Sequence, residues 1–236
     1  MYLPLTKKIV FPLLGVCLAG SLFSQTLNEE ILSHGHPHED GELSVTSETL
    51  SLAFGDSISK ELDEHAVWKI FTHDDGDVIA TGIGSIEEYQ FSIPGKYRLF
   101  VPGHTSLLEG TCEHHFETQE TIIEVSPFRM KFDFSAITFS AAIVGGTELS
   151  NVEITVPATL EIFEADLPEY NGRITSSGIG ANLSGQLSEG PIQLKEGLNQ
   201  LTFNLSGTAT KDTYIMLDFY DVNNHIHCYY FPNKLR

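Results

Sequence analysis

The sequence predicts an all-β fold, arranged as two tandem β-sandwich domains. Short stretches in which apolar and polar residues alternate follow one another at the spacing of strands. Turns rich in glycine and proline separate these stretches, and no segment of the mature chain repeats its apolar residues at the period of a helix. Strands that bury one face against other elements produce this pattern. A hydrophobic fraction of 41% is sufficient to fill the cores of two such domains.

The first 24 residues have the character of a secretory signal peptide. Lys7 and Lys8 precede an uncharged apolar run from Ile9 to Phe23, and the small residue Ser24 follows it. That run is too short to span a membrane comfortably. We therefore expect export to the periplasm, the cell surface or the medium, with no transmembrane segment in the mature chain.

Cys17 offers an alternative, because it follows Leu14-Gly15-Val16 as a lipoprotein cysteine follows its signal. Valine fits the position before such a cysteine poorly, and the residues after Cys17 are still apolar rather than a polar tether. A cleaved signal peptide explains the segment better than lipidation does.

The charge of the chain argues against nucleic acid as a partner. The formal net charge is −19, and removal of the signal peptide with its two lysines makes it more negative. Such a surface repels phosphate backbones. Basic patches on proteins, divalent cations and neutral glycans remain as partners, so we expect an envelope protein or a glycan.

Residues 25–42 are predicted to form a flexible, histidine-rich leader. The segment is polar and has no apolar period, and it places His34, His36 and His38 at alternate positions beside a proline and two glycines. Such a run can hold a metal weakly, but a solvated tail is its ordinary role.

Residues 43–127 are predicted to form the first sandwich. Its strands are expected within 43–54, 65–72, 78–84, 91–101 and 120–126. In the fourth of these, Tyr97, Leu99 and Val101 share one face. The domain ends at Ser126-Pro127, because proline disfavours continued pairing in a central strand.

The stretch F-S-I-P-G-K-Y-R-L, Phe91 to Leu99, resembles the core motif of polycystic-kidney-disease-type (PKD) domains, immunoglobulin-like sandwiches common in exported bacterial proteins. Trp68 and the turn D-D-G-D at 74–77 add to the likeness, which covers about 43–126. The chain departs from the family pattern where Thr72-His73 precedes that turn, and again in a long loop after the tyrosine strand. The resemblance implies an extracytoplasmic spacer or binding module without catalytic residues.

Residues 128–236 are predicted to form a second sandwich, for which we recognise no family. Strand signals occupy 130–144 and 152–163, the latter broken or kinked at Pro157. The glycine- and serine-rich stretch 173–190 reads as irregular or as weak edge strands. Two hairpins follow, at 191–207 and 213–231.

Histidine and cysteine residues suggest a possible zinc or copper site. Cys112, His114 and His115 lie in the long loop of the first domain, and His225 and His227 lie in the last hairpin. Imidazole and thiolate ligands suit both metals. If the loop folded against the hairpin, these side chains would meet at one ion.

Cys228 has other roles open to it. It alternates in phase with Ile226 and Tyr230, which predicts a packed cysteine, whereas His227 faces the opposite side. A strand directs adjacent residues to one ion only through a bulge. A disulfide between Cys112 and Cys228, or two free thiols, are the alternatives to a metal site.

Tyrosines crowd the last hairpin. Tyr214, Tyr220 and Tyr229 are candidates for a solvent-exposed face that stacks on sugar rings or contacts a partner protein. Packing against a neighbouring sheet is an equal alternative, because tyrosine favours strands.

No catalytic signature accompanies these features. The sequence contains no glycine-flanked serine elbow, no HExxH motif and no recognisable Ser/His/Asp order. We therefore expect a secreted, non-enzymatic binding or structural protein of a bacterial cell envelope. The alternative is an envelope metal-binding protein that uses the histidine and cysteine clusters.

Overall fold

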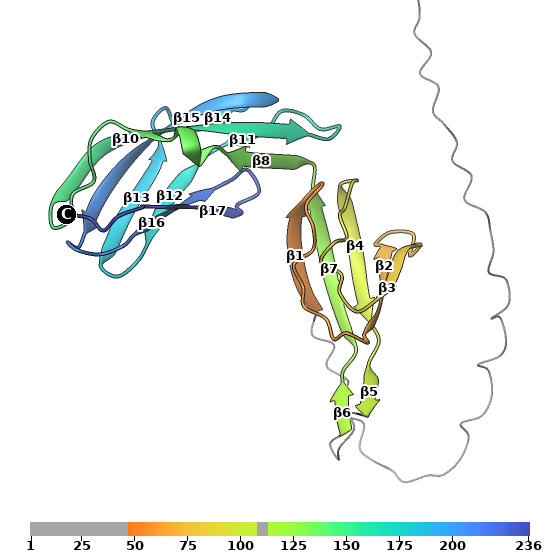
Figure 1. Ribbon diagram of the computed structural model, residues 1–236. Coiled ribbons are helices and arrows are strands. Elements are labelled where there is room, and N and C mark those ends of the chain that lie inside the picture. The colour runs from red at the N-terminus through yellow and green to blue at the C-terminus, as the bar shows by residue number, and fades with distance from the viewer. Residues whose placement is uncertain (1–46, 108–112) are drawn as a thin grey trace, which may run out of the picture. The chain divides into compact units, whose positions relative to one another are not determined.

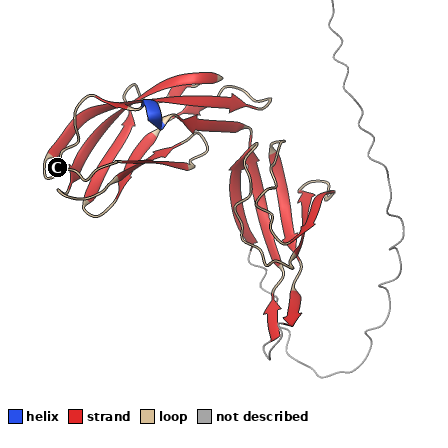
Figure 2. Ribbon diagram, viewed as in Figure 1, coloured by secondary structure: helices blue, strands red, loops and turns tan. Residues whose placement is uncertain are grey.

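The computed structural model describes residues 47–107 and 113–236 of the chain (Figure 1). Within this part, all regular elements are strands apart from one short 3₁₀ turn, Phe134–Ala136 (Figure 2). The predicted all-β fold is confirmed. None of the described residues belongs to a helix with the length and apolar character that crossing a membrane requires. The predicted signal peptide, Cys17, the leader at 25–42 and Cys112 lie outside the described residues.

The first sheet has five strands in the order β1-β7-β4-β2-β3. Their bounds are Ser47–Ala53 (β1), Val67–Thr72 (β2), Val78–Ile83 (β3), Gly95–Val101 (β4) and Gln119–Ser126 (β7). Strand β1 pairs with β7 in parallel, and the other pairs are antiparallel. Two further strands, β5 (His104–Leu107) and β6 (Glu113–Phe116), pair where the sequence predicted a loop.

One face of the first sheet is buried by the segments that connect its strands. Ile70 and Leu99 lie at most 1% exposed on this face, and Ile58, Ile86 and Phe91 from the connections pack against it. Trp68 needs the bare backbone of Gly82, since a Cβ there would lie 2.2 Å from the indole ring. A hydrogen bond of 2.8 Å from the Tyr97 hydroxyl to the carbonyl of Ile93 fixes the proline-glycine turn.

The second sheet follows the order β17-β16-β12-β13-β15-β10-β8, and β9 also pairs with β10. The strands are β8 (Phe128–Phe132), β9 (Thr138–Phe139), β10 (Glu148–Ile162), β12 (Arg173–Ser177), β13 (Ala181–Leu187), β15 (Gly197–Ala209), β16 (Met216–Tyr220) and β17 (Ile226–Tyr230). A separate short pair joins β11 (Glu169–Tyr170) to β14 (Ile192–Gln193).

Four strand predictions for this half were wrong. The strand signal at 130–144 gives β8 and the two-residue β9, with the 3₁₀ turn between them. The hairpin predicted at 191–207 does not form, because β14 pairs with β11 while β15 pairs with β10 and β13. The stretch 173–190 forms β12 and β13 inside the sheet, because Ile174 and Leu183 point into the core while serine and threonine face outward. Strand β10 runs unbroken through Pro157. On one edge of β10, β9 pairs only as far as Thr155 and β8 begins at Ala158, so the missing N–H of proline costs no ladder bond there.

The two sheets have separate hydrophobic clusters. The second cluster centres on Leu201, Phe203 and Leu205. These residues occupy alternate positions in the sequence, and their side chains are fully buried. Polar and aromatic contacts join the sheets, among them Arg129 with Asp56 at 3.2 Å and the rings of Phe54 and Phe163 at 5.8 Å. The predicted division into domains at residue 127 stays a prediction.

Candidate binding surface

The two ends of the second sheet approach each other through aromatic rings. Tyr229 of β17 packs against Phe134 of the 3₁₀ turn and against Phe139 of β9, with ring centroids 5.8 Å apart in both pairs. Phe231 extends the cluster, with its ring centroid 5.7 Å from that of Phe139. Among the described residues, β17 pairs only with β16, so the sheet ends meet through side chains rather than through backbone hydrogen bonds.

A groove of about 580 Å³ opens beside this aromatic cluster. Phe139 and residues 141–144 line one side, and Tyr229 with residues 231–236 lines the other. Most of these side chains are apolar, and Val144 in the groove is 41% exposed. We call this feature the C-terminal groove. Exposed apolar surface of this kind marks interaction sites on soluble proteins.

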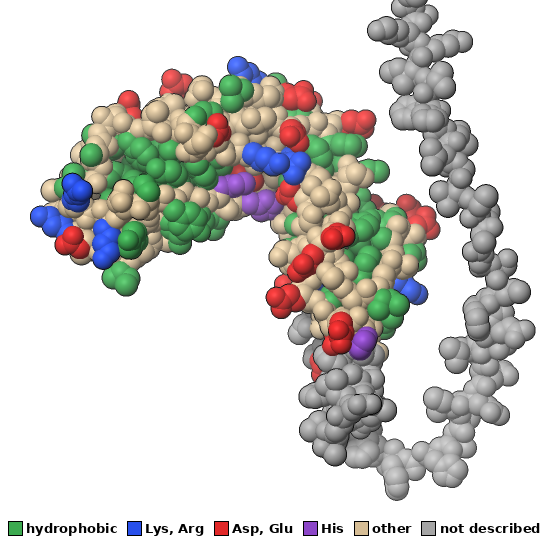
Figure 3. All heavy atoms as spheres, in the orientation of Figure 1, with side chains coloured by type: hydrophobic (Ala, Val, Ile, Leu, Met, Phe, Trp, Pro, Cys, Tyr) green, Lys and Arg blue, Asp and Glu red, His purple; other side chains and the backbone are tan. Residues whose placement is uncertain are grey.

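The charged side chains that line the C-terminal groove are both basic. Lys234 and Arg236 line it, and no acidic residue does. Lys211 lies close by, since its side chain covers Gly146. Figure 3 shows Lys and Arg side chains gathered at this end of the second sheet, around the C-terminal mark of Figure 1. Figure 3 also shows an acidic side chain among them, and Asp212 lies nearby, since its backbone N–H donates to the carbonyl of Leu235 at 2.8 Å. Basic side chains nevertheless predominate here, in a sequence with 32 acidic and 13 basic residues.

Of the three tyrosines predicted to share one binding face, the structure separates Tyr220 from the other two. Tyr229 lines the C-terminal groove. Tyr214 is 62% exposed and stands next to that groove, with the Lys234 ammonium 5.5 Å from its ring centroid. Tyr220 lies at the other end of β16, with its side chain on the outer face of the sheet. The common face was therefore a wrong prediction, because Tyr220 and Tyr229 sit in opposite phases of their paired strands.

A second, polar groove of about 430 Å³ lies on the outer face of the same sheet. Its polar side chains are Arg173 and Thr175 of β12, Ser184 and Gln186 of β13, and Asn204 of β15. The Arg173 guanidinium stacks on the Tyr220 ring, 4.1 Å from its centroid. The Tyr220 hydroxyl lies 3.4 Å from that of Thr175. Sequence reasoning missed this groove because its residues come from the stretch read as irregular.

Asp221 organises the turn between β16 and β17. Its buried carboxylate accepts hydrogen bonds of 2.8 Å from the backbone N–H groups of Asn223 and His225. These two bonds go to Oδ1. The other oxygen, Oδ2, lies 3.2 Å from His227 Nε2 and 3.7 Å from His225 Nδ1, so the two histidines predicted as metal ligands share one carboxylate. Below them, the Tyr170 hydroxyl donates to the carbonyl of Tyr220 at 2.6 Å, and burial, followed by the charge of Asp221, raises the Tyr170 pKa.

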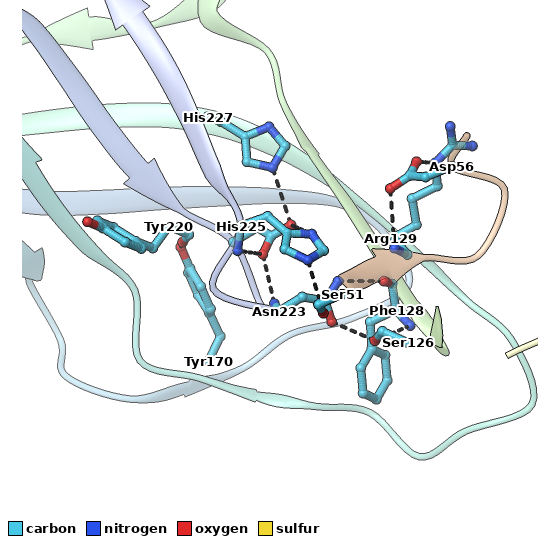
Figure 4. A network of polar contacts seen from close by, with 12 residues as sticks. Ser51, Asp56, Ser126, Phe128, Arg129, Tyr170, Tyr220, Asn223, His225 and His227 are labelled. Carbon is cyan, nitrogen blue, oxygen red and sulfur yellow. Dashed lines mark hydrogen bonds and ion pairs between the residues drawn. The ribbon is translucent and has the colours of Figure 1, made fainter. Parts of the chain in front are cut away.

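The same turn contacts the first sheet, as Figure 4 shows. The Ser126 hydroxyl donates to Asn223 Oδ1 at 2.5 Å, and Asn223 Nδ2 donates to the carbonyl of Phe128 at 2.8 Å. His225 Nε2 lies 3.3 Å from the hydroxyl of Ser51. This places a serine, a histidine and Asp221 in a row, but the His225–Asp221 distance of 3.7 Å is longer than the hydrogen bond that a catalytic relay uses.

Cys228, predicted as a packed cysteine, is partly buried on the outer face of the sheet. Its thiol donates to Asp218 Oδ1 at 3.2 Å, and the hydroxyl of Ser177 donates to the other oxygen of the same carboxylate. Burial and the adjacent Asp218 raise the pKa of the Cys228 thiol. The sulfur is a free thiol in the structure, which does not support the alternative of a disulfide to Cys112.

The predicted metal site stays a prediction, because Cys112 and the side chains of His114 and His115 lie outside the part of the chain whose side chains the structure describes. Among residues 48–103 and 117–236, whose side chains are described, no group of three or more His, Cys, Asp and Glu side chains is placed to hold a metal ion. His227 faces the side of β17 opposite to Cys228, as the sequence predicted, and His225 lies in the turn that precedes the strand. His114 and His115 belong to β6, and Cys112 lies outside the described residues.

Comparisons with known proteins do not identify the chain. No protein-family model and no curated protein matches it, so the resemblance to PKD domains stays a prediction. Among solved structures, it is similar to a DUF3823 family protein from Parabacteroides merdae, with 12% identity, 80% of this chain and 98% of the other covered, and a TM-score of 0.27.

Two further solved structures show the same degree of likeness. The fibronectin(III)-like modules of Clostridium thermocellum CbhA share 11% identity over 80% of this chain and 89% of theirs, with a TM-score of 0.22. A DUF3823 family protein from Bacteroides ovatus shares 12% identity over 78% of this chain and 97% of its own, with a TM-score of 0.23. With TM-scores this low, these likenesses carry no argument about function.

Proposed function

We propose that this chain is an exported, non-enzymatic binding protein of a bacterial cell envelope, and that its second sheet recognises a protein partner through the C-terminal groove. The observation that carries the proposal is the groove itself, an apolar surface lined by Phe139 and Tyr229 and bordered by Lys234 and Arg236. Protein interfaces combine an aromatic centre with a polar rim in this way. The signal-like N-terminal segment supports export.

Site-specific photo-crosslinking tests this function. A photo-reactive amino acid placed at Val144, inside the groove, should form an adduct with one envelope protein when full-length protein is exposed to envelope extract. The same group at Ile179, which is 86% exposed and outside the groove, is the matched control. Tyr229→Ala should abolish the adduct at position 144. The same adducts from both positions, or none from position 144, would overturn the proposal.

A neutral glycan is the second candidate partner, and the polar groove favours it. Gln186, Asn204 and Thr175 present amide and hydroxyl groups that match sugar hydroxyls, beside the ring of Tyr220. Retention on a glycan array that is lost in Tyr220→Ala but kept in Tyr229→Ala would favour the glycan over the protein partner.

A further inference from the structure

The backbone of β17 presents a free edge next to the C-terminal groove. Two hydrogen bonds fix which of its residues point toward β16: the N–H of Asp221 donates to the carbonyl of His225 at 2.9 Å, and the N–H of Phe231 donates to the carbonyl of Ile215 at 3.3 Å. In an antiparallel pair the direction of these groups alternates along the strand. His227 and Tyr229 therefore bond to β16, as their register with it requires.

The residues between them direct their backbone groups the other way. Ile226, Cys228 and Tyr230 point their N–H and C=O groups away from β16, and in the described part of the chain no other strand pairs with β17 on that side. Ile226 is 54% exposed and Tyr230 is 69% exposed, and no hydrogen bond joins the outward backbone groups of β17 to another described residue. The strand contains no proline and no lysine, arginine, aspartate or glutamate, the residues that normally protect an edge from pairing.

We propose that the partner binds by strand addition: an extended segment of a protein pairs with the outer edge of β17 and inserts alternate apolar side chains into the C-terminal groove. This deepens the proposed function and rests on it. Backbone bonds to Ile226, Cys228 and Tyr230 supply affinity, and the groove selects the side chains on one face of the added strand.

The basic residues of the groove determine a second property of the added segment, the charge at its end. Lys234 and Arg236 line the groove without an acidic neighbour among its lining residues, in a chain whose net charge is −19. An acidic residue at one end of the added strand would lie beside these two basic side chains. The ligand is thus an extended peptide that alternates apolar and polar residues and ends in aspartate or glutamate.

The test uses a synthetic probe, a fluorescent peptide of alternating valine and threonine that ends in two aspartates. Its binding to full-length protein is measured by fluorescence anisotropy. Tyr230→Pro removes one outward N–H and should weaken binding about tenfold, the effect of one lost hydrogen bond. Tyr230→Ala is the matched control, because it removes the same side chain, keeps the N–H and should bind nearly as the native protein does. Circular dichroism melting verifies that Tyr230→Pro is folded.

The charge requirement is tested with the same probe. Lys234→Glu with Arg236→Glu should weaken binding of the aspartate peptide, and should leave binding of a peptide that ends in two serines unchanged. Equal binding by Tyr230→Pro and Tyr230→Ala would overturn strand addition. If the crosslink at position 144 persists in that case, the protein-binding function stands without it. A concentration-dependent dimer in ultracentrifugation that Tyr230→Pro abolishes would identify a second copy as the occupant and overturn the peptide proposal.

Discussion

The thiol of Cys228 and the carboxylate of Asp218 form a coupled pair on the outer face of the second sheet. Burial is the largest cause of the raised pKa of the thiol, and the hydrogen bond and charge of Asp218 raise this pKa further. Because the folded pKa lies above the unfolded one, this thiol contributes stability at pH values below its unfolded pKa, and the contribution is lost as the pH rises through the folded pKa. The pair therefore keeps the sulfur protonated and slow to react.

Asp218→Asn tests this coupling. Loss of the negative charge should lower the pKa of Cys228, so that alkylation by iodoacetamide at pH 8 becomes faster, as measured by mass spectrometry of the peptide that contains this cysteine. Asp212→Asn serves as the control, because Asp212 is exposed and does not contact the sulfur, so the loss of its charge should leave the alkylation rate unchanged. A slower reaction in Asp218→Asn would contradict the assignment.

Single residues also show what alternation predicts and what it leaves open. The pattern of Tyr97, Leu99 and Val101 predicts one shared face, and all three are buried. The same reasoning assigned Cys228 to the correct phase, with Ile226 and Tyr230, but did not say which side of the sheet that phase would face. Period-2 alternation separates two faces without saying which one meets the core, and a strand with apolar residues on both faces leaves that choice to the tertiary structure.

Among the strands, β13 and β15 approach each other at a glycine. Gly207 has a φ of 123°, and a Cβ there would lie 2.1 Å from the carbonyl oxygen of Asn182. Gly207→Ala should therefore lower the free energy of unfolding by about 3 kcal/mol or more, from strain and overlap together. Urea denaturation measures this change.

Gly197 in the same strand is the matched control. Its φ is 86°, and no atom lies within 4 Å of a Cβ built on it. Gly197→Ala should cost only about 1 kcal/mol, the strain of the left-handed conformation alone. Equal losses in the two variants would show that the contact with Asn182 does not limit the packing of β13 on β15.

The strands that the sequence predicted poorly share one physical cause. Serine and glycine in 173–190 lower intrinsic strand preference, yet β12 and β13 lie in the middle of the sheet because Ile174, Leu183 and Leu187 are buried there. Pro157 was read as a break because its neighbours in space are not visible in the sequence. Tertiary pairing overrides local preference in both cases.

At the level of the whole molecule, the two hydrophobic clusters predict two separable unfolding events. Trp68 is the single tryptophan and belongs to the first cluster, so its fluorescence reports on the first sheet. Ile70→Ala, at a fully buried position of that cluster, should lower the urea midpoint of the fluorescence transition by removing about 2–5 kcal/mol of stability.

Leu205→Ala is the counterpart in the second cluster, where Leu205 is also fully buried. It should leave the Trp68 transition in place while hydrogen exchange accelerates in β10, β13 and β15. A common shift of both signals in either variant would show that the contacts between the sheets make the molecule one cooperative unit.

The candidate site was the least predictable part. The C-terminal groove joins residues 139–144 to residues 229–236, and only the curling of the second sheet brings these segments together. The sequence predicts Tyr229 as a contact residue but groups this tyrosine with Tyr220. The strand register places Tyr220 on the other face of the sheet. A signal for the groove was present in the aromatic residues Phe132, Phe134 and Phe139, whose partners cannot be read from spacing alone.

The parallel pairing of β1 with β7 has a mechanical consequence. The chain enters β1 at Ser47 and leaves β7 at Ser126, at opposite ends of two strands that run in the same direction. A pulling force between these two points slides the strands along each other and loads all of their backbone hydrogen bonds at once, whereas an antiparallel pair would open one bond at a time. If the protein is held at a point before Ser47 and pulled at a point after Ser126, the first sheet therefore resists that tension in its strongest direction.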